Sequence, residues 1–292
     1  MKKKYIVRSK QETVVMSIVF VLFALYALTL IYPFVWTFLN SLKSNQEYFD
    51  NPFSLPKDWE FVNYIESFTF LEVKKSNPLY TANMIEMIFN SLWFTVGAAI
   101  VGLTVSTFVA YALSKYQFPG RSAIYATAIF VMIIPIVGSM PSFYILVNTL
   151  HITNSPFFLI TAASGFGFNF IVMYGFFKNI SWSYAEAGFI DGAGNWRVFL
   201  SIMIPQAKPA IVSLFIIACI GSWNDYMTPL VYLPDFPTLS TGLFLFKATS
   251  PTSNDEPVYF AGILVSMIPI LILFVLFQET IMSNMVAGGL KG

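Results

Sequence analysis

Long runs of uncharged, mostly apolar residues alternate with short polar segments along this chain. Residues 13–42, 87–114 and 257–278 form runs of 30, 28 and 22 residues that contain no Asp, Glu, Lys or Arg. A helix needs about 20 mostly apolar residues to cross a hydrocarbon core about 30 Å thick, so each run predicts one transmembrane helix. A fourth run, 122–177, is 56 residues long and has room for two.

Polar residues and a proline near the middle of the fourth run, Asn148, Asn154 and Pro156, predict a turn between its two helices. A further helix is predicted from about Pro209 to Leu233, although it contains Asp225. The short alternating segments expected of β-barrel strands are not seen. The pattern therefore predicts an all-α, polytopic membrane protein. Its six predicted transmembrane helices cover approximately 14–40, 88–113, 122–147, 156–177, 209–233 and 258–280.

The composition agrees with this pattern. Hydrophobic residues make up 57% of the 292 residues and charged residues only 11%, whereas about 25% of the residues of a soluble domain are charged. A soluble globular protein is thereby excluded. The net charge of +1 argues against nucleic-acid binding. One Cys and one His rule out an intrachain disulfide and a Cys/His metal cluster, and we predict no metal site.

The distribution of Lys and Arg predicts the orientation. With the N-terminus in the cytoplasm, eleven of the 16 basic residues fall in cytoplasmic segments, which is the bias that membrane proteins show. Residues 1–13 are then a cytoplasmic N-terminus, 14–292 form a six-helix domain, and both termini are cytoplasmic. The first apolar run is about twice as long as the apolar region of a signal peptide, so we predict an uncleaved first helix.

Two loops are too long to be simple connections. The external loop, about 43–86, contains Pro52, Pro56 and Trp59, and we expect it to form short helices over the outer mouth. It is either a structured cap or a docking surface for a partner. The cytoplasmic loop, about 178–208, contains the more informative sequence.

Local signals in the cytoplasmic loop predict a helix-turn-helix. Ser183 and Glu186 have the spacing of a capping box, in which each side chain accepts a hydrogen bond from a free backbone N–H at a helix start. Asp191-Gly192 is expected to end this helix, because glycine adopts backbone conformations that other residues resist. Asn195 is expected to cap a second helix over 196–204, which stops before Pro205.

The same loop displays apolar side chains that a segment of about 30 residues cannot bury in a core of its own: Tyr184, Phe189, Ile190 and Trp196. Exposed apolar groups at helical spacing indicate a partner surface. The alternative is that the helix folds back on the membrane-embedded bundle. Spacing alone does not separate the two.

The loop resembles the EAA loop of the permease subunits of bacterial ATP-binding-cassette (ABC) importers, through Glu186-Ala187-Gly188, Asp191-Gly192-Ala193, Ile202, Pro205 and Pro209. The resemblance covers almost the whole chain and is strongest to the carbohydrate-uptake branch, in particular the maltose-permease G-type subunit. It is carried by Asn90-Ser91, Ala110-Tyr111-Ala112-Leu113, Phe118-Pro119-Gly120-Arg121, Pro135, Pro141, Trp223-Asn224-Asp225, Pro229 and the ending Ala287-Gly288-Gly289-Leu290-Lys291-Gly292.

This resemblance implies a type I ABC importer permease fold in the bacterial inner membrane and half of a pathway for mono- or oligosaccharide uptake. It implies three kinds of protein partner: a second, homologous permease, a cytoplasmic ATPase dimer and an extracytoplasmic solute-binding protein. The chain contains no G-x-x-x-x-G-K-[ST] phosphate loop. ATP and Mg²⁺ are therefore expected on the ATPase, and this chain is expected to be non-catalytic and to carry no cofactor.

In the family, the EAA helix occupies a cleft on the ATPase. Carried over to this chain, Ala185, Ala187 and Gly188 offer a small surface for close approach, Phe189 is the apolar anchor, and Glu186 is a cap or a salt-bridge partner. Asp191, Gly192 and Pro205 complete the implied coupling set. Gly188 departs from the family pattern, which has Ala there, and glycine lowers helix propensity by about 1 kcal/mol.

The solute pathway has one sequence-based candidate. Asp225 is an ionisable residue within a predicted span, which suggests a cavity, because a charge facing lipid costs several kcal/mol. With Trp223, Asn224 and Tyr226 it combines apolar rings and hydrogen-bonding groups, as a sugar site requires. The alternative is a structural polar cluster that fixes helix packing.

Other functions remain as alternatives. One alternative is that the imported solute is not a sugar but, for example, a glycerol phosphate ester. A channel or secondary transporter also has six apolar helices, but it ordinarily needs more charges within its spans. An integral membrane enzyme lacks support, since no H-E-x-x-H or G-x-S-x-G motif is present. The sequence leaves open which sugar is carried, which permease contacts it, and whether the binding protein is periplasmic or lipid-anchored.

Overall fold

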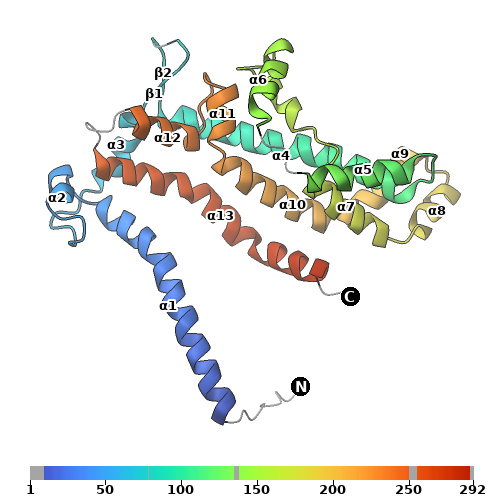
Figure 1. The fold of residues 1–292 in the computed structure, drawn as a ribbon, viewed down its shortest axis with the longest axis horizontal. Coiled ribbons are helices and arrows are strands. Elements are labelled where there is room, and N and C mark those ends of the chain that lie inside the picture. The colour runs from blue at the N-terminus through green and yellow to red at the C-terminus, as the bar shows by residue number, and fades with distance from the viewer. Residues whose placement is uncertain (1–9, 78, 135–137, 250–254, 290–292) are drawn as a thin grey trace. The chain divides into compact units, whose positions relative to one another are not determined.

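The computed structural model describes residues 10–77, 79–134, 138–249 and 255–289, with side chains up to Glu279, and these residues are predominantly helical (Figure 1). The chain divides into two compact units. The first comprises Met1–Phe70 and Thr252–Val265, and the second comprises Leu71–Pro251 and Ser266–Gly292. The predicted all-α class is therefore correct apart from one small hairpin.

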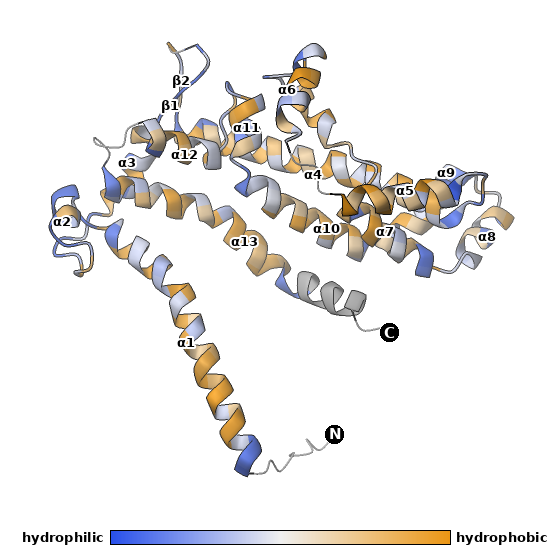
Figure 2. Cartoon of the chain, viewed as in Figure 1, coloured by the Kyte–Doolittle hydropathy of each residue, from blue (hydrophilic) through white to orange (hydrophobic). Residues whose placement is uncertain are grey.

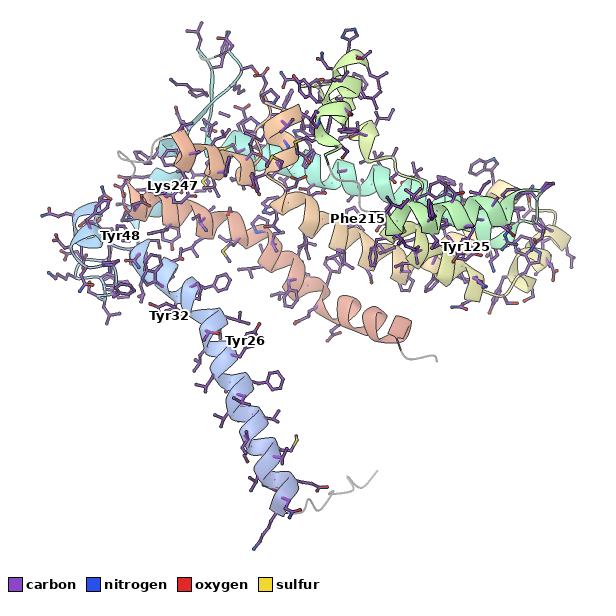
Figure 3. All side chains as sticks on the ribbon, in the orientation of Figure 1. Tyr26, Tyr32, Tyr48, Tyr125, Phe215 and Lys247 are labelled. Carbon is purple, nitrogen blue, oxygen red and sulfur yellow. The ribbon has the colours of Figure 1, made fainter. Side chains whose placement is uncertain are left out.

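The first unit contains α1 (Lys10–Asn40), α2 (Asn45–Asp50), α3 (Val62–Phe70) and the start of α13 (Glu256–Gly289). α1 and α13 confirm the helices predicted over 14–40 and 258–280. Figure 2 shows α1 as apolar along most of its length. Its side chains project outward, including Tyr26 at 60% exposure and Tyr32 at 55% (Figure 3). Apolar side chains exposed on every face suit a helix surrounded by lipid.

The segment after α1, which the sequence predicts to be external, forms the short helices α2 and α3, as expected. Lys43 fixes the start of this segment. Its side chain is fully buried, and Lys43 Nζ donates a hydrogen bond to the Asn51 carbonyl at 2.9 Å. Burial lowers the pKa of Lys43 more than the neighbouring Glu47 raises it. Asn63 Nδ2 donates to the carbonyls of Ser41 and Lys43, both at 2.9 Å, and ties α3 to this turn.

The second unit begins with a hairpin, which the hydropathy pattern did not predict. Strand β1 (Val73–Lys74) pairs antiparallel with β2 (Thr81–Ala82), and Val73 lies opposite Ala82. Helix α4 (Met84–Lys115) follows and confirms the helix predicted over 88–113. Asn83 caps α4 by accepting a hydrogen bond from the Glu86 N–H at 3.0 Å. α4 is the central helix of this unit and packs against η1, α7, α10 and α12.

The prediction of one helix over 122–147 is wrong. The structure has α5 (Arg121–Ile133) and α6 (Met140–Thr149) with a break between them. Gly138 in the break has φ +77°, a left-handed conformation that does not continue a helix, and Pro141 lies in the first turn of α6. Pro135, part of the family resemblance, lies outside the described residues.

The prediction of one helix over 156–177 is also wrong. A 3₁₀ helix, η1 (Pro156–Ala162), is followed by irregular backbone and then by α7 (Phe168–Asn179). Gly167 has φ +131°, which interrupts the helical run. Gly165 lies in the same break, where an added Cβ would come 3.2 Å from Val109 Cγ2 on α4. The interruption of the helix and its close packing on α4 thus occur at the same place.

The helix predicted over 209–233 differs at both ends. Helix α9 (Asn195–Val198), the π turn η2 (Phe199–Met203) and α10 (Ile204–Asn224) form one continuous helix, and α11 (Met227–Tyr232) is separate. The expected stop before Pro205 is therefore wrong. Proline lacks an N–H and its ring clashes with the preceding turn, and the π turn just before Pro205 widens the helix there. After α11 comes α12 (Leu239–Thr249).

Four helices of the described residues are long and apolar enough to cross a membrane. They are Lys10–Asn40, Met84–Lys115, Asn195–Asn224 and Glu256–Glu279. The other two predicted crossings correspond to the interrupted segments α5–α6 and η1–α7.

Candidate functional site

The loop over 178–208 contains α8 (Ser183–Ile190), which begins one residue earlier than the predicted capping box implies and ends before Asp191-Gly192, as the sequence predicts. Gly192 ends it with φ +79°. The capping box is wrong, because Ser183 is already the first helical residue and its Oγ pairs with Ser181 Oγ at 2.7 Å. The Glu186 N–H donates instead to the Trp182 carbonyl at 3.1 Å. The first turn of α8 is therefore formed by backbone contacts.

One face of α8 packs against its own chain. Ala185 is fully buried and Gly188 is buried. A Cβ added to Gly188 would lie 2.6 Å from Ile202 Cδ1 and 3.2 Å from Val198 Cγ2. The glycine therefore lets α8 approach the α9–η2 segment closely. Two of the three small residues expected to face a partner lie inside the chain instead.

Phe189 also packs inward. It is half-buried against the hydrophobic cluster around Phe170 and Phe177, and its ring centroid lies 6.0 Å from that of Trp182. The interpretation that α8 folds back on the bundle is thus correct for this face of the helix.

The opposite face is open. On α8, Tyr184 is 54% exposed and Ile190 86%, and Trp196 on the neighbouring helix α9 is 68% exposed. Glu186, Ala187, Asp191, Gly192 and Pro205 are exposed as well. We call Tyr184, Ala187, Ile190 and Trp196 the loop surface. The expectation that this loop displays apolar side chains is therefore correct for Tyr184, Ile190 and Trp196.

Asn195 does not cap the second helix, because α9 begins at this residue and Gly194 precedes it as the cap. Its Oδ1 accepts a hydrogen bond from the Tyr116 hydroxyl at 3.3 Å. This bond links the start of α9 to the residue that follows α4.

The base of the loop is tied to the end of α4. Lys115 Nζ donates a hydrogen bond to the Ile180 carbonyl at 2.5 Å. The rings of Tyr116 and Trp182 meet edge to face with centroids 5.9 Å apart. The end of α4 is therefore in direct contact with the residues that lead into α8.

The four pathway candidates do not form one cluster. Trp223 is buried, and its Nε1 donates to the Ser266 carbonyl at 3.1 Å. Asn224 Nδ2 donates to the Ile220 carbonyl of its own helix at 2.8 Å, and the Tyr226 ring packs on Phe244 with centroids 4.8 Å apart. These three residues serve helix packing.

Asp225 differs from them. Its Oδ1 accepts a hydrogen bond from the Thr228 N–H at 3.0 Å, which caps α11, and the residue lines a pocket of about 400 Å³. Asp225 is therefore both a helix cap and part of a cavity wall.

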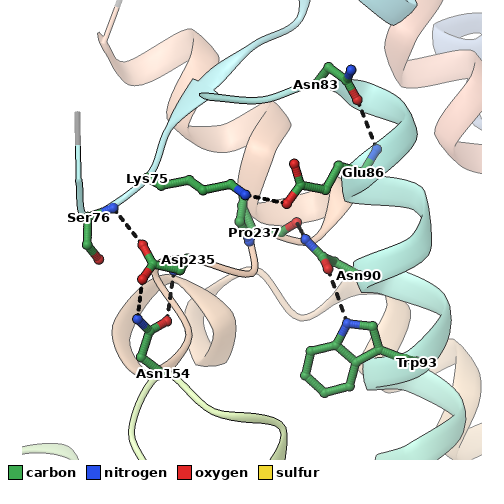
Figure 4. Close-up of polar contacts among 9 residues, drawn as sticks. All are labelled: Lys75, Ser76, Asn83, Glu86, Asn90, Trp93, Asn154, Asp235 and Pro237. Carbon is green, nitrogen blue, oxygen red and sulfur yellow. Dashed lines mark hydrogen bonds and ion pairs between the residues drawn. The ribbon is translucent and has the colours of Figure 1, made fainter. Parts of the chain in front are cut away.

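Sequence reasoning missed a polar cluster that joins three loops of the second unit (Figure 4). Asp235 accepts hydrogen bonds from the Ser76 N–H at 2.8 Å and from Asn154 Nδ2, and its own N–H donates to Asn154 Oδ1 at 2.9 Å. We call these three residues the outer clasp. Beside it, Lys75 pairs with Glu86. The available signal was Asn154, which lies in a predicted turn, since asparagine is common in turns.

The charge of Asp235 is stabilised by these contacts. Burial alone would raise its pKa, but the hydrogen bonds from Asn154 and Ser76 and the charge of Lys75 together hold the pKa below its ordinary value. The clasp is consequently charged near neutral pH.

Comparison with known proteins gives consistent matches. A family model described as binding-protein-dependent transport system inner membrane component matches residues 102–285. The diacetylchitobiose uptake system permease protein NgcG of Streptomyces coelicolor is 30% identical over 91% of this chain and 86% of that protein. The arabinooligosaccharides transport system permease protein AraQ of Bacillus subtilis is 25% identical over 92% of this chain and 94% of its own length.

A solved structure has the same fold. It is a bacterial ABC transporter involved in the import of the acidic polysaccharide alginate, and one of its chains superimposes with a TM-score of 0.77. That chain is 25% identical, and the match covers 93% of this chain and 98% of that one.

Proposed function

The chain belongs to the binding-protein-dependent transport system inner membrane component family, and on that premise we propose that it is one of two permease subunits of an ATP-driven carbohydrate importer. It forms half of the translocation pathway, and a second, homologous permease forms the other half. A cytoplasmic ATPase dimer binds ATP and Mg²⁺ and hydrolyses the ATP. An extracytoplasmic binding protein delivers the solute.

The observation that carries this proposal is the two-faced helix α8. Its inner face, with Ala185, Gly188 and Phe189, holds the helix to the chain, and the loop surface on the other side is free for the ATPase. Exposed aromatic and aliphatic side chains of this kind are typical anchors of protein interfaces. Movement of the ATPase would pass from α8 to α4 through Lys115 and to η2 through Ile202.

Glu186 and Asp191 contribute charge at this interface. Both carboxylates are exposed and, among the described residues, neither forms an ion pair with Lys or Arg. They are therefore available to basic residues of the ATPase, which favour fast and specific association. Gly192 provides the turn between α8 and α9, and Pro205 lies at the start of α10.

A carbohydrate is the proposed solute because the similar proteins NgcG and AraQ are described as permease proteins of a diacetylchitobiose uptake system and an arabinooligosaccharides transport system. The alginate transporter, whose chain has the same fold, also imports a saccharide. The shared property is a chain of hydroxylated rings.

We propose six crossings with both termini in the cytoplasm, of which α5–α6 and η1–α7 are the interrupted ones. Cysteine labelling tests this topology in a Cys219→Ser background. A membrane-impermeant maleimide should label Ser54→Cys in intact cells and Ser201→Cys only after the membrane is opened. Labelling of both in intact cells contradicts the orientation.

Copurification tests the assembly. Tagged wild-type chain should bring down an ATPase and a second permease, whereas Ile190→Glu should keep the permease and lose the ATPase, because it places a charge at the centre of the loop surface. Phe53→Glu is the matched control, since Phe53 is a similarly exposed apolar residue of the outer segment, at 76%. Isolation of the wild-type chain by itself, as a monomer or homotetramer, contradicts the proposal and favours a channel.

A further inference from the structure

Three interruptions of the predicted transmembrane helices meet at one pocket of about 400 Å³. Ser139 and Met140 come from the end of the break between α5 and α6, and Thr161 and Ala162 from the end of η1. Asp225 lies in the break between α10 and α11. In a membrane protein, irregular backbone is tolerated where it is buried in protein or lines a water-filled cavity. The three interruptions thus border one cavity, as this rule expects.

The lining combines hydroxyl groups with an aromatic wall. Ser139, Thr161, Ser222 and Thr228 contribute hydroxyls, each from a different element or break. The lining also includes Phe158 and Tyr232, whose rings stack with centroids 5.2 Å apart and an interplanar angle of 17°. Pockets for small molecules have this composition, with apolar and aromatic walls and a few polar groups that set orientation, and volumes of about 300–1,000 Å³.

Asp225 supplies the negative charge of the pocket. It is the one Asp, Glu, Lys or Arg among the described lining residues. Its Oδ1 accepts the Thr228 N–H. No other described donor bonds to this carboxylate, so it retains acceptor capacity toward the cavity.

The outer clasp holds this pocket in shape. The Asn154 N–H donates to the Tyr232 carbonyl at 2.7 Å, and Asn154 is bonded to Asp235. The Tyr232 hydroxyl donates to the Met140 carbonyl at 3.4 Å, across the pocket wall. Tyr232, which forms part of the aromatic wall, is thus held both by its backbone carbonyl and by its hydroxyl.

We propose that this pocket is a solute-binding subsite within this permease subunit and that it takes an uncharged hydroxylated ring, as in a neutral oligosaccharide. The proposal rests on the proposed transport function. Sugar hydroxyls would donate to Asp225 and exchange hydrogen bonds with the serine and threonine hydroxyls, and the apolar face of the ring would contact the aromatic wall. A uronate would place its carboxylate beside Asp225, where like charges repel.

The test uses the whole complex in proteoliposomes, with the second permease, the ATPase dimer and the binding protein. The labelled probes are diacetylchitobiose, maltotriose, arabinotriose and trigalacturonate, and both sugar uptake and ATP hydrolysis are measured. The variants are Asp225→Asn, Asp225→Glu and the control Asp58→Asn, an exposed aspartate of the outer segment. Asn retains the oxygen that caps α11, so the fold is preserved.

The expected result is that the wild-type complex carries at least one neutral probe and not trigalacturonate. Asp225→Asn should lower the sugar carried per ATP by about tenfold, the loss expected when a hydrogen bond to a charged acceptor is removed. ATP hydrolysis stimulated by the loaded binding protein should stay close to the wild-type level. Asp225→Glu should recover most of the uptake, and Asp58→Asn should match the wild type.

Two results would overturn the subsite alone: unchanged uptake in Asp225→Asn, or wild-type uptake restricted to trigalacturonate. In both, transport remains ATP-driven, so the proposed function stands. Failure of the proposed function would give a different result. The wild-type complex would then transport none of the probes, and its ATPase would not respond to the binding protein. That result would overturn the subsite as well.

Discussion

Gly188 illustrates at the level of one residue how two effects oppose each other. An alanine would favour the helix by about 1 kcal/mol, but its Cβ would approach Ile202 Cδ1 to 2.6 Å. That atom is the end of a flexible side chain and can rotate away. We therefore expect Gly188→Ala to keep uptake near the wild-type level, whereas Gly188→Leu cannot be accommodated.

For Gly188→Leu, overpacking costs about 1–3 kcal/mol, which lowers the population of docked α8 by roughly 5- to 150-fold. Uptake should fall by a comparable factor while the protein still inserts in the membrane. The measurement is initial uptake rate per inserted chain, determined for both variants. Equal rates for Leu and Ala would mean that α8 does not need to pack on η2.

The second prediction for a single residue concerns Asp235. Asp235→Asn replaces an acceptor with a donor opposite Asn154 Nδ2, and losing a hydrogen bond to a charged group costs about 1.5–3 kcal/mol. We expect the purified complex to melt at a lower temperature than the wild type. Asp58→Asn, on an exposed side chain, should melt like the wild type.

The pH dependence of this difference follows from the lowered pKa of Asp235. A carboxyl with a lowered pKa in the folded state stabilises the protein fully above its ordinary value, 3.8, and loses this contribution only as the pH falls through the folded value. The melting difference between wild type and Asp235→Asn should therefore be the same at pH 7 and pH 5. A difference that is already lost at pH 5 would show that Asp235 is not held in its charged form.

At the scale of secondary structure elements, the turn between α8 and α9 determines how the loop surface is presented. Gly192 has φ +79°, whereas proline fixes φ near −65°. Gly192→Pro should abolish uptake and the stimulation of the ATPase, with insertion unchanged. Gly194→Ala is the matched control, because Gly194 has φ −76° and an added Cβ meets no atom within 4 Å. Wild-type transport in Gly192→Pro would remove the turn from the coupling mechanism.

Hydropathy predicted α1, α4 and α13 correctly because each is one uninterrupted helix with a uniformly apolar sequence. It missed the breaks in the other three because the length of an uncharged run does not change when it contains a single helix-breaking residue such as Gly138 or Gly167. The hairpin was missed since its strands are two residues each, too short to produce a pattern. The π turn before Pro205 was not predicted, since proline was taken as a stop.

The site was predictable to a similar extent. Local signals gave the end of α8, since Gly192 follows it with φ +79°, whereas its start was placed one residue too late because Ser183 was taken as the cap. Which face of α8 is buried depends on Ile202 and Val198, which follow ten or more residues later, and no local pattern contains that contact. The pocket at Asp225 joins residues from Phe94 to Tyr232, so only the folded chain brings it together.

At the scale of the whole molecule, the proposed mechanism gives each part a separate task. In that mechanism, the loop surface receives the movement of the ATPase, α4 carries it across the membrane, and the outer clasp holds the wall of the pocket. The chain itself supplies no energy in this account, which agrees with its lack of a phosphate loop.

The most direct test of the central claim is sugar accumulation in proteoliposomes that contain the complete complex. The account predicts accumulation against a concentration gradient that requires both ATP on the ATPase side and loaded binding protein on the other side, and that Gly192→Pro abolishes. Accumulation or equilibration of the sugar without ATP, or through this chain reconstituted by itself, would contradict it.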